Sequence, residues 1–279
     1  MAKREDKESK FLDAKGVKDL INKSTGMKNA YNLLMDDPTS VKGWIKSGNK
    51  LLDSNICEGK IAGLPKGRIS MYVAESGVGK SFIAIEHCKQ AIDEGIHPVY
   101  FCSEPGGIEY DFLIKVLGPE RMEQFTYVEI TYMEEMFETI DSLLANTTNE
   151  YLFVWDSLAA TPSRMEAEGG FDASSFFAVA AKAASLGLKK IMIPLSRRNC
   201  TFLILNQVRE NIGATKYELM SNATKFKIPG GKFVVFCCSL VILLLAKPTK
   251  SNAVLGANQE KIGKHGEAYF LKSRFRTEG

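Results

Sequence analysis

The chain has few cysteines and none of the spacings that would make them a structural framework. Its six cysteines contain no CxxC pair, and no secretory leader precedes them. This pattern argues against a disulfide framework and against a zinc site. We therefore expect a reducing cytoplasm as the setting of this protein.

Long apolar runs and a strong net charge are also missing. The longest apolar stretch, the 14 residues from Phe233 to Ala246, contains Ser239, whereas a helix that spans a bilayer needs about 20 apolar residues. We expect buried core strands there and no membrane partner. The net charge of +3 does not by itself indicate a nucleic-acid-binding protein, so that argument must rest on where the cations lie.

The chain divides into a charged head and a longer core. With 279 residues, 45% of them hydrophobic, it can build one large α/β domain with an appendage or two small domains. Residues 1–10 carry seven charges of mixed sign, as a solvated tail does. We expect residues 1–50 to form this tail and a short amphipathic helix, which covers either the protein's own core or a neighbouring subunit, and residues 51–279 to form the core. The helix is predicted from apolar residues at helical spacing: Phe11, Ala14, Val17, Leu20 and Ile21.

From Ile69 onward, short apolar runs alternate with longer helical patterns. The runs are Ile69–Val73, Val99–Cys102, Phe125–Ile130, Tyr151–Trp155, Thr201–Leu205, Val234–Ala246 and Ala268–Leu271. Such alternation predicts an α/β fold in which a mostly parallel, twisted sheet is covered by helices on both faces. Ligands of these sheets bind beyond the carboxyl ends of the strands.

The segment after the first of these runs has the pattern of a phosphate-binding loop. It reads Ala74-Glu75-Ser76-Gly77-Val78-Gly79-Lys80-Ser81, between an apolar run and the helical pattern Phe82–Ile92. Backbone N–H groups of such a loop bind phosphate oxygens, Lys80 adds a cation for the β- and γ-phosphates, and Ser81 offers a hydroxyl to Mg²⁺. Ala74 replaces the glycine of the stricter pattern, which suits only a turn that does not demand positive φ there. We predict ATP binding through residues 75–81.

Polar residues end three later apolar runs. Asp156 follows Tyr151–Trp155, where a carboxylate can hold Mg²⁺ beside the phosphate loop together with Ser81. Glu104 follows the next run after the loop's helix and can orient or deprotonate the attacking water. Gln207 follows Thr201–Leu205 and can sense the γ-phosphate through a neutral amide. Each of these positions also fits a plain turn or cap residue.

Together these motifs resemble the RecA-type recombinases. The resemblance covers roughly residues 50–279. Two segments look closer to the phage UvsX-like branch of the family: Ser103–Ile108 and Leu271–Arg274. A phage protein of this branch would act in the cytoplasm of a bacterial host. The motifs that carry it, in order, are Gly63–Ile69, the phosphate loop, Ser103-Glu104, Asp156-Ser157-Leu158-Ala159-Ala160, Asn206-Gln207-Val208-Arg209 with Ile212-Gly213, and Pro229-Gly230-Gly231-Lys232-Phe233.

The resemblance implies two DNA-binding loops along the axis of a helical filament, at about 162–171 and 208–231. Their cations can neutralise phosphates and their aromatic rings can stack on bases. The candidate DNA-binding residues are Arg164 in the first loop and Arg209, Lys216, Lys225, Phe226, Lys227 and Lys232 in the second. Glu166, Glu168 and Asp172 weaken a purely electrostatic account of the first loop, and a solvated surface loop is the alternative for each.

The resemblance also implies that Lys272 and Arg274 complete the ATP site of a neighbouring subunit, with an exposed strand face as the alternative. The expected function is a DNA-dependent ATPase that uses Mg²⁺, coats single-stranded DNA as a filament, and pairs it with duplex DNA in recombination and repair. Single-strand-binding and mediator proteins are further expected partners. The expected catalytic residues are Lys80, Glu104, Gln207, Lys272 and Arg274.

Two other functions use the same core. A hexameric helicase motor would form closed rings around a nucleic-acid strand, and a non-motor paralogue would bind ATP and a recombinase partner with slow turnover. A small-molecule kinase ranks last because it leaves the two loops unexplained. The chain stops at Gly279, directly after the basic strand, so we expect either a truncated form of a longer recombinase or a compact relative.

Overall fold

A computed structural model of the chain contains two compact units, Met1–Val41 and Lys42–Gly279. The division falls before the expected boundary at residue 50, so that residues 42–50 belong to the larger unit. The structure describes residues 11–26, 28, 30–33, 37–38, 40–57, 59–60, 62–169, 176–211, 225–246, 253–255, 257–258 and 261–275.

The smaller unit contains the helix predicted near the N-terminus, α1 (Ala14–Thr25). The Asp13 carboxylate accepts a hydrogen bond from the Gly16 backbone N–H, and Gly26, with φ of 64°, ends the helix in the left-handed conformation. The prediction of a helix is therefore confirmed. Its apolar side chains Val17, Leu20 and Ile21 are exposed.

The larger unit is built on a seven-stranded sheet with the strand order β13-β10-β3-β7-β6-β4-β5. All neighbouring pairs are parallel except β10 and β13, which are antiparallel. The mostly parallel α/β fold predicted from the sequence is thus confirmed. The strands are β3 (Ile69–Ala74), β4 (His97–Cys102), β5 (Thr126–Glu129), β6 (Tyr151–Asp156), β7 (Thr201–Gln207), β10 (Leu240–Ala246) and β13 (Gly266–Ser273).

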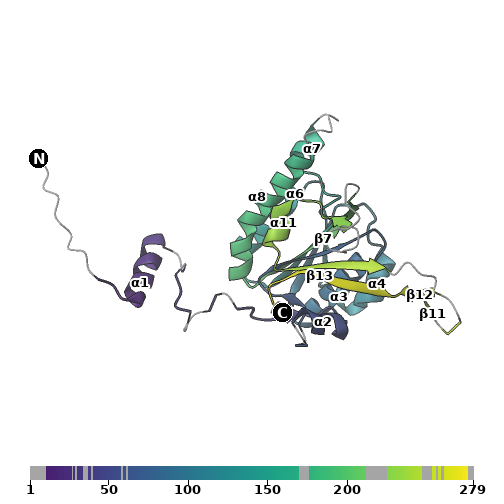
Figure 1. Cartoon of the computed structure of the whole chain (residues 1–279), viewed down its shortest axis with the longest axis horizontal. Helices are drawn as coiled ribbons and strands as arrows, with labels where there is room; N and C mark the ends of the chain where they lie inside the picture. The colour runs from purple at the N-terminus through teal and green to yellow at the C-terminus, as the bar shows by residue number, and fades with distance from the viewer. Residues whose placement is uncertain are drawn as a thin grey trace, which may run out of the picture. The chain divides into compact units, whose positions relative to one another are not determined.

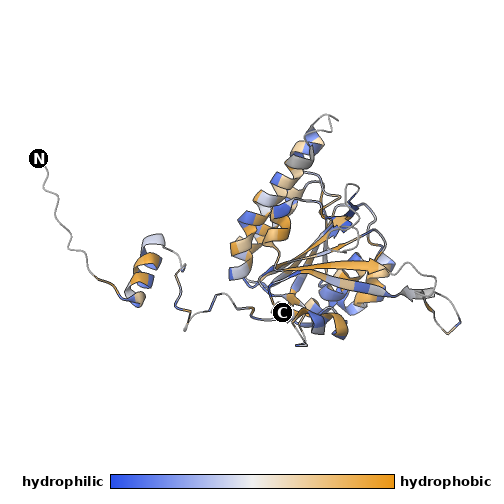
Figure 2. Ribbon diagram, in the orientation of Figure 1, coloured by the Kyte–Doolittle hydropathy of each residue, from blue (hydrophilic) through white to orange (hydrophobic). Residues whose placement is uncertain are grey.

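Helices cover both faces of this sheet (Figure 1). One face packs against α6 (Met133–Asn146), α8 (Phe176–Arg197) and α11 (Lys232–Cys237). The other packs against α2 (Lys50–Ile56), α3 (Lys80–Asp93) and α4 (Tyr110–Leu117). Alternation along β3 explains both layers, since Met71 and Val73 belong to the first core cluster and Tyr72 and Ala74 to the second. Figure 2 shows the strands as a hydrophobic layer between helices of mixed hydropathy.

Shorter elements complete the larger unit. The helices α5 (Pro119–Met122) and α7 (Arg164–Glu168) are less than two turns long. Three two-stranded ribbons pair β1 (Trp44–Ile45) with β2 (Leu64–Pro65), β8 (Arg209–Glu210) with β9 (Phe226–Lys227), and β11 (Ala253–Leu255) with β12 (Lys261–Lys264).

The prediction of strands throughout Phe233–Ala246 is wrong in its first half. Residues Lys232–Cys237 form the helix α11, and only Leu240–Ala246 forms a strand. Val234 and Cys237 of α11 are buried three residues apart, as on one face of a helix. A continuous apolar run carries no alternation, so its period does not distinguish a buried helix from a buried strand.

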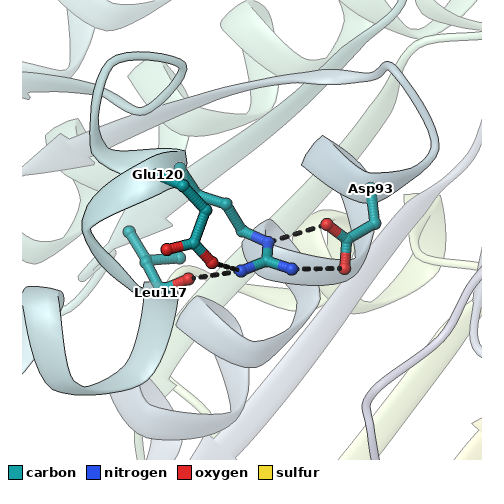
Figure 3. Close-up of polar contacts among 4 residues, drawn as sticks. Asp93, Leu117 and Glu120 are labelled. Atoms are coloured by element: carbon teal, nitrogen blue, oxygen red, sulfur yellow. Dashed lines mark hydrogen bonds and ion pairs between the residues drawn. The ribbon is translucent and has the colours of Figure 1, made fainter.

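Arg121 links the far end of the phosphate-loop helix to the helices that follow it (Figure 3). Its guanidinium donates to both carboxylate oxygens of Asp93, the last residue of α3, and to the carbonyl oxygen of Leu117, the last residue of α4. It also pairs with Glu120. The C-terminal end of α3 is thereby tied to α4 and α5, while its N-terminal end faces the sheet edge described below.

Among the residues that the structure describes, none of the helices combines the length and the apolar character needed to cross a bilayer.

Candidate functional site

The phosphate-loop motif lies at the carboxyl edge of the sheet, between β3 and α3. Gly77 and Gly79 have φ of 72° and 107°, values that favour glycine. A Cβ at either position would meet no heavy atom within 4 Å, so the backbone of the loop faces open space. The loop leads into the N-terminus of α3, whose first N–H groups lack helical partners. Backbone donors and open space together suit an anion such as a phosphate.

Lys80, the first residue of α3, is folded back onto this loop. Its Nζ donates to the carbonyl oxygens of Ala74, at 3.2 Å, and Glu75, at 2.9 Å. The residue is only 8% exposed. Burial lowers the pKa of Lys80, while the charges of Asp156 and Glu104 act in the opposite direction. The ammonium group is therefore a buried cation at the base of the loop, and it interacts electrostatically with the carboxylates of Asp156 and Glu104.

Asp156 ends β6 and joins three elements through one carboxylate oxygen. Its Oδ2 accepts from the Ser81 hydroxyl of α3, at 2.8 Å, and from the Tyr100 hydroxyl of β4, at 2.5 Å. The Asp156–Ser157 peptide bond is cis. The two residues predicted to hold a metal ion, Ser81 and Asp156, are thus in direct contact.

Tyr100 is a member of this cluster that the sequence analysis missed. It lies inside an apolar run that predicts only a core strand, and its side chain is fully buried. A buried phenol needs a hydrogen-bond partner, which is the one signal in the sequence that could have pointed to it. Burial, followed by the charge of Asp156, raises the pKa of Tyr100 well above its ordinary value, so the hydroxyl keeps its proton and acts as the donor.

Glu104 lies beside the end of β6, just beyond the end of β4. The Ser157 hydroxyl donates to its Oε1 at 3.4 Å. The turn is fixed by Ser103, whose backbone N–H donates to the Asp156 carbonyl oxygen at 2.9 Å. Glu104 itself is exposed. The structure therefore brings together Lys80, Ser81, Glu104 and Asp156, as the sequence predicts.

Gln207 is the last residue of β7 and pairs in register with Ala74, the last residue of β3. The next residue, Val208, donates its backbone N–H to the Ala74 carbonyl oxygen at 3.1 Å. The neighbouring Asn206 is fully buried, and its amide Nδ2 donates to the carbonyl oxygen of Pro229 at 2.9 Å. The strand β7, which pairs with the strand that precedes the phosphate loop, is therefore connected directly to the second predicted DNA loop.

The second predicted DNA loop begins and ends in the β8–β9 ribbon. Arg209 pairs with Lys227, and Glu210 pairs with Phe226. The Lys225 ammonium lies 5.2 Å from the centroid of the Phe226 ring. The ribbon, with Lys225 directly before β9, thus places three cations and an aromatic ring at the two ends of the loop. Lys232, the first residue of α11, is exposed, and Lys216 lies outside the described residues.

The prediction that residues 162–171 form an irregular loop is wrong over part of this segment. Residues Arg164–Glu168 form the helix α7, which begins with reciprocal hydrogen bonds between Ser163 and Glu166. The Arg164 guanidinium lies over the Tyr132 ring, 5.8 Å from its centroid. The serine and the glutamate three residues later are a helix-start pattern that the sequence analysis did not use.

A cavity of about 800 Å³ lies between the segment that carries α7, the helix α8 and the segment that carries β9. Both predicted DNA loops adjoin it, since its lining includes Leu158, Thr161, Glu166, Ala181, Arg209 and Lys227. Its walls are mostly apolar, with charged groups from both segments.

Lys272 and Arg274 lie at the opposite, amino edge of the sheet. Arg274 donates its backbone N–H to the Ser239 carbonyl oxygen, and Ser239 donates to that of Ile69, the first residue of β3. The phosphate loop follows the last residue of β3, about 15 Å away at the usual rise of a strand. The Lys272 ammonium donates to the carbonyl oxygens of Val235 and Phe236, at 2.9 and 2.7 Å, and Arg274 donates to that of Phe236 at 3.3 Å. The structure therefore does not bring this pair to the phosphate loop of its own chain.

Within the described residues, no group of three histidine, cysteine or acidic side chains is arranged to hold a metal ion. A metal at the phosphate loop would have the Ser81 hydroxyl and the Asp156 carboxylate as its protein oxygens. This small donor set suits Mg²⁺, which keeps several waters and takes its remaining ligands from phosphates.

Comparisons with known proteins agree with this arrangement. Protein RecA of Malacoplasma penetrans is 34% identical over 170 residues, which are 61% of this chain and 49% of that protein. Protein RecA of Fusobacterium nucleatum is 30% identical over 236 residues, 84% of this chain and 58% of that protein. The mitochondrial DNA repair protein recA homolog of Dictyostelium discoideum is 29% identical over 202 residues, 69% of this chain and 41% of that protein.

The chain spans about half the length of the curated relatives that it matches. Residues 14–275 match the RecA N-terminal domain, a region that contains α1, the whole sheet and both of its charged edges. The chain belongs to the RecA family.

Proposed function

We propose that this protein is an ATP-dependent recombinase of the UvsX-like branch that coats single-stranded DNA as a helical filament and promotes pairing and strand exchange with duplex DNA. The observation that carries the proposal is the pairing of Ala74 with Gln207. It joins the end of the phosphate-loop strand to the strand that leads directly into the basic β8–β9 ribbon. A change in the phosphate loop can therefore reach the cations of that ribbon through adjacent backbone.

The residues present fit Mg²⁺ and ATP. The open backbone around Gly77 and Gly79 leaves room for phosphate oxygens, and Lys80 can turn from the Ala74 and Glu75 carbonyl oxygens toward an anion. Ser81 and Asp156 would hold Mg²⁺. When bound, ATP would supply the phosphoanhydride bond that is hydrolysed, and Mg²⁺ would neutralise charge on its phosphates.

Glu104 is the residue that we propose to orient and deprotonate the attacking water. It is exposed, as a base that meets water must be, and Ser157 holds it beside Asp156. Gln207 would sense the γ-phosphate and, through Val208, change the position of the β8–β9 ribbon. The cations Arg209, Lys225 and Lys227 would then bind DNA phosphates, while Phe226 would stack on a base.

Lys272 and Arg274 would act on the ATP of a neighbouring subunit. Their location at the amino edge, about 15 Å by strand rise from the start of their own phosphate loop, supports a role in trans. Two adjacent cations can neutralise charge that develops on the γ-phosphate, as an arginine finger does. A neighbour related head to tail would bring the amino edge of one chain to the carboxyl edge of the next, which is the geometry of a filament.

The test is ATP hydrolysis measured against protein concentration, with and without single-stranded DNA, on samples imaged by negative-stain microscopy in the same buffer. We expect strong stimulation by DNA and open helical filaments. Closed rings would favour a helicase motor instead. Little turnover without assembly would favour a non-motor paralogue.

A further inference from the structure

We propose that Tyr100 is a positioning residue for the metal ion, because its hydroxyl fixes the orientation of the Asp156 carboxylate. This inference rests on the proposed function, in which Asp156 and Ser81 hold Mg²⁺. It adds Tyr100 of β4, whereas Asp156 lies on β6 and Ser81 on α3, and Tyr100 would not itself touch the metal.

The two carboxylate oxygens of Asp156 differ in their hydrogen bonds. Oδ2 accepts from both Ser81, at 2.8 Å, and Tyr100, at 2.5 Å. Among the hydrogen bonds of the described residues, none involves Oδ1. The carboxylate torsion of an aspartate is broad, so one donor alone would leave the group free to turn. Two donors from separate elements hold Oδ2 and leave Oδ1 to accept from the water shell of a metal ion.

The Tyr100 side chain is rigid enough for this task. It is fully buried on β4, the strand next to β6. Its ring stacks on Tyr127, with centroids 6.4 Å apart and planes 12° from parallel, and packs against Phe125 at 5.9 Å. Ser81, in contrast, would also offer its oxygen to the metal. Tyr100 is thus the donor to Asp156 that is not itself a proposed metal ligand.

The test compares Tyr100→Phe with Tyr127→Phe. Tyr127 is a matched control because it stacks on the same ring from β5 and makes no hydrogen bond to Asp156 among those of the described residues. The readout is the Mg²⁺ concentration that half-saturates binding of a mant-labelled ATP, without DNA, together with binding in excess EDTA and the melting temperature of the nucleotide-free protein. For Tyr100→Phe we expect a rise of about tenfold in the Mg²⁺ requirement, the usual lower size of such an outer-shell effect, with binding in EDTA unchanged.

Replacement of Tyr100 by 4-aminophenylalanine keeps a donor on the ring and should restore the wild-type Mg²⁺ requirement. An unchanged requirement in Tyr100→Phe, or an equal rise in Tyr127→Phe, would overturn the inference. A wild-type protein that binds no mant-labelled ATP at any Mg²⁺ concentration would instead overturn the proposed function.

A second measurement does not depend on the folding of Tyr100→Phe. In wild-type protein labelled with ¹³C at the tyrosine ζ carbons, the signal that is lost in the 4-aminophenylalanine variant should shift with ATP and Mg²⁺ but not with ATP in EDTA. A signal that moves equally in both conditions would mean that Tyr100 does not respond to the metal.

Discussion

The two edges of the seven-stranded sheet hold their charged residues in different ways. At the carboxyl edge, Lys80, Ser81 and Asp156 come from two elements and interact with one another through side chains and charge. At the amino edge, the side chains of Lys272 and Arg274 donate to carbonyl oxygens at the end of α11, and the described residues show no other hydrogen bond from either side chain. One edge holds side chains that interact with one another, and the other is a pair of cations with no acidic partner in the described part of the chain.

This difference indicates what the amino edge lacks. Burial and the charge of Arg274 lower the pKa of Lys272, which means that the surroundings disfavour its positive charge. An anion brought by another molecule would stabilise both. The carboxyl edge also suits an anion, because its open loop offers backbone donors and one lysine to a ligand with several negative charges. The two edges are complementary, and they lie on opposite sides of one chain.

The largest effect should come from Lys80→Ala at the carboxyl edge. The fold should remain intact, since the ammonium group that is removed donates, among the hydrogen bonds of the described residues, to the carbonyl oxygens of Ala74 and Glu75. ATP affinity and ATP-dependent DNA binding should be lost, as measured by nucleotide titration and by DNA binding with and without ATP. Lys89→Ala on the same helix is the control. An unchanged ATP affinity in Lys80→Ala would remove the lysine from the nucleotide site.

Glu104→Gln should separate nucleotide binding from turnover. We expect ATP to bind and DNA complexes to persist, while hydrolysis slows by about 10²–10⁴-fold, the usual contribution of a positioned base. Single-turnover hydrolysis measures this directly. Glu109→Gln, at the exposed N-cap of α4, should keep the normal rate. A normal rate in Glu104→Gln would assign the base to another residue.

Acid should destabilise the layer beneath the carboxyl edge. His87 of α3 is fully buried, its Nε2 lies 2.8 Å from the Tyr72 hydroxyl of β3, and burial lowers its pKa from 6.5 to about 4. The unfolded chain takes up a proton as the pH falls below about 6.5, whereas the folded chain does so only near 4, so acid favours unfolding. At about 1.4 kcal/mol per pH unit, the loss between these values is about 3 kcal/mol.

Urea unfolding at pH 7 and pH 4.5 tests this prediction. His87→Gln should remove most of the difference between the two pH values that is due to this histidine. His97→Gln, which alters a partly buried contact with Thr126, should retain it. Equal pH dependence in His87→Gln and the wild-type protein would contradict the assignment.

The smallest effect concerns the β8–β9 ribbon, which lies beyond the carboxyl edge. Lys225→Ala with Lys227→Ala should flatten the dependence of single-stranded-DNA affinity on salt by up to about 0.7 in the logarithmic slope for each lost phosphate contact. DNA titrations over a range of salt concentrations measure this slope. Lys115→Ala on α4 should leave it unchanged. An unaltered slope in the double variant would locate the DNA elsewhere.

The sequence predicted the carboxyl edge well because its signals are local. The loop Glu75–Gly79 is flanked by a strand and a helix. Asp156 directly follows a recognisable apolar run, and Glu104 lies two residues after another. Parallel strands bring such ends to one edge without further information. The predicted runs for β3, β4, β5, β6 and β7 also agree with the observed strands to within two residues at each end.

What the sequence did not predict depends on register and on helical period. The contact of Tyr100 with Asp156 requires that β4 and β6 be neighbours, with Cys102 opposite Asp156. The location of Lys272 at the amino edge requires the antiparallel pairing of β13 with β10. The sequence does not predict the helices α7 and α11, because α7 lies in a segment predicted as a loop and α11 lies in an apolar run without alternation.

The measurement that tests the complementarity of the two edges most directly is a mixing experiment. Glu104→Gln protein keeps the basic pair, and protein with Lys272→Ala and Arg274→Ala keeps the carboxyl edge. Each alone should lack DNA-stimulated ATP hydrolysis. In an equal mixture assembled on DNA, about a quarter of head-to-tail interfaces should combine an intact carboxyl edge with an intact amino edge, so hydrolysis should recover to about that fraction of the wild-type rate. A mixture that assembles into filaments but stays inactive would contradict an ATP site shared between subunits.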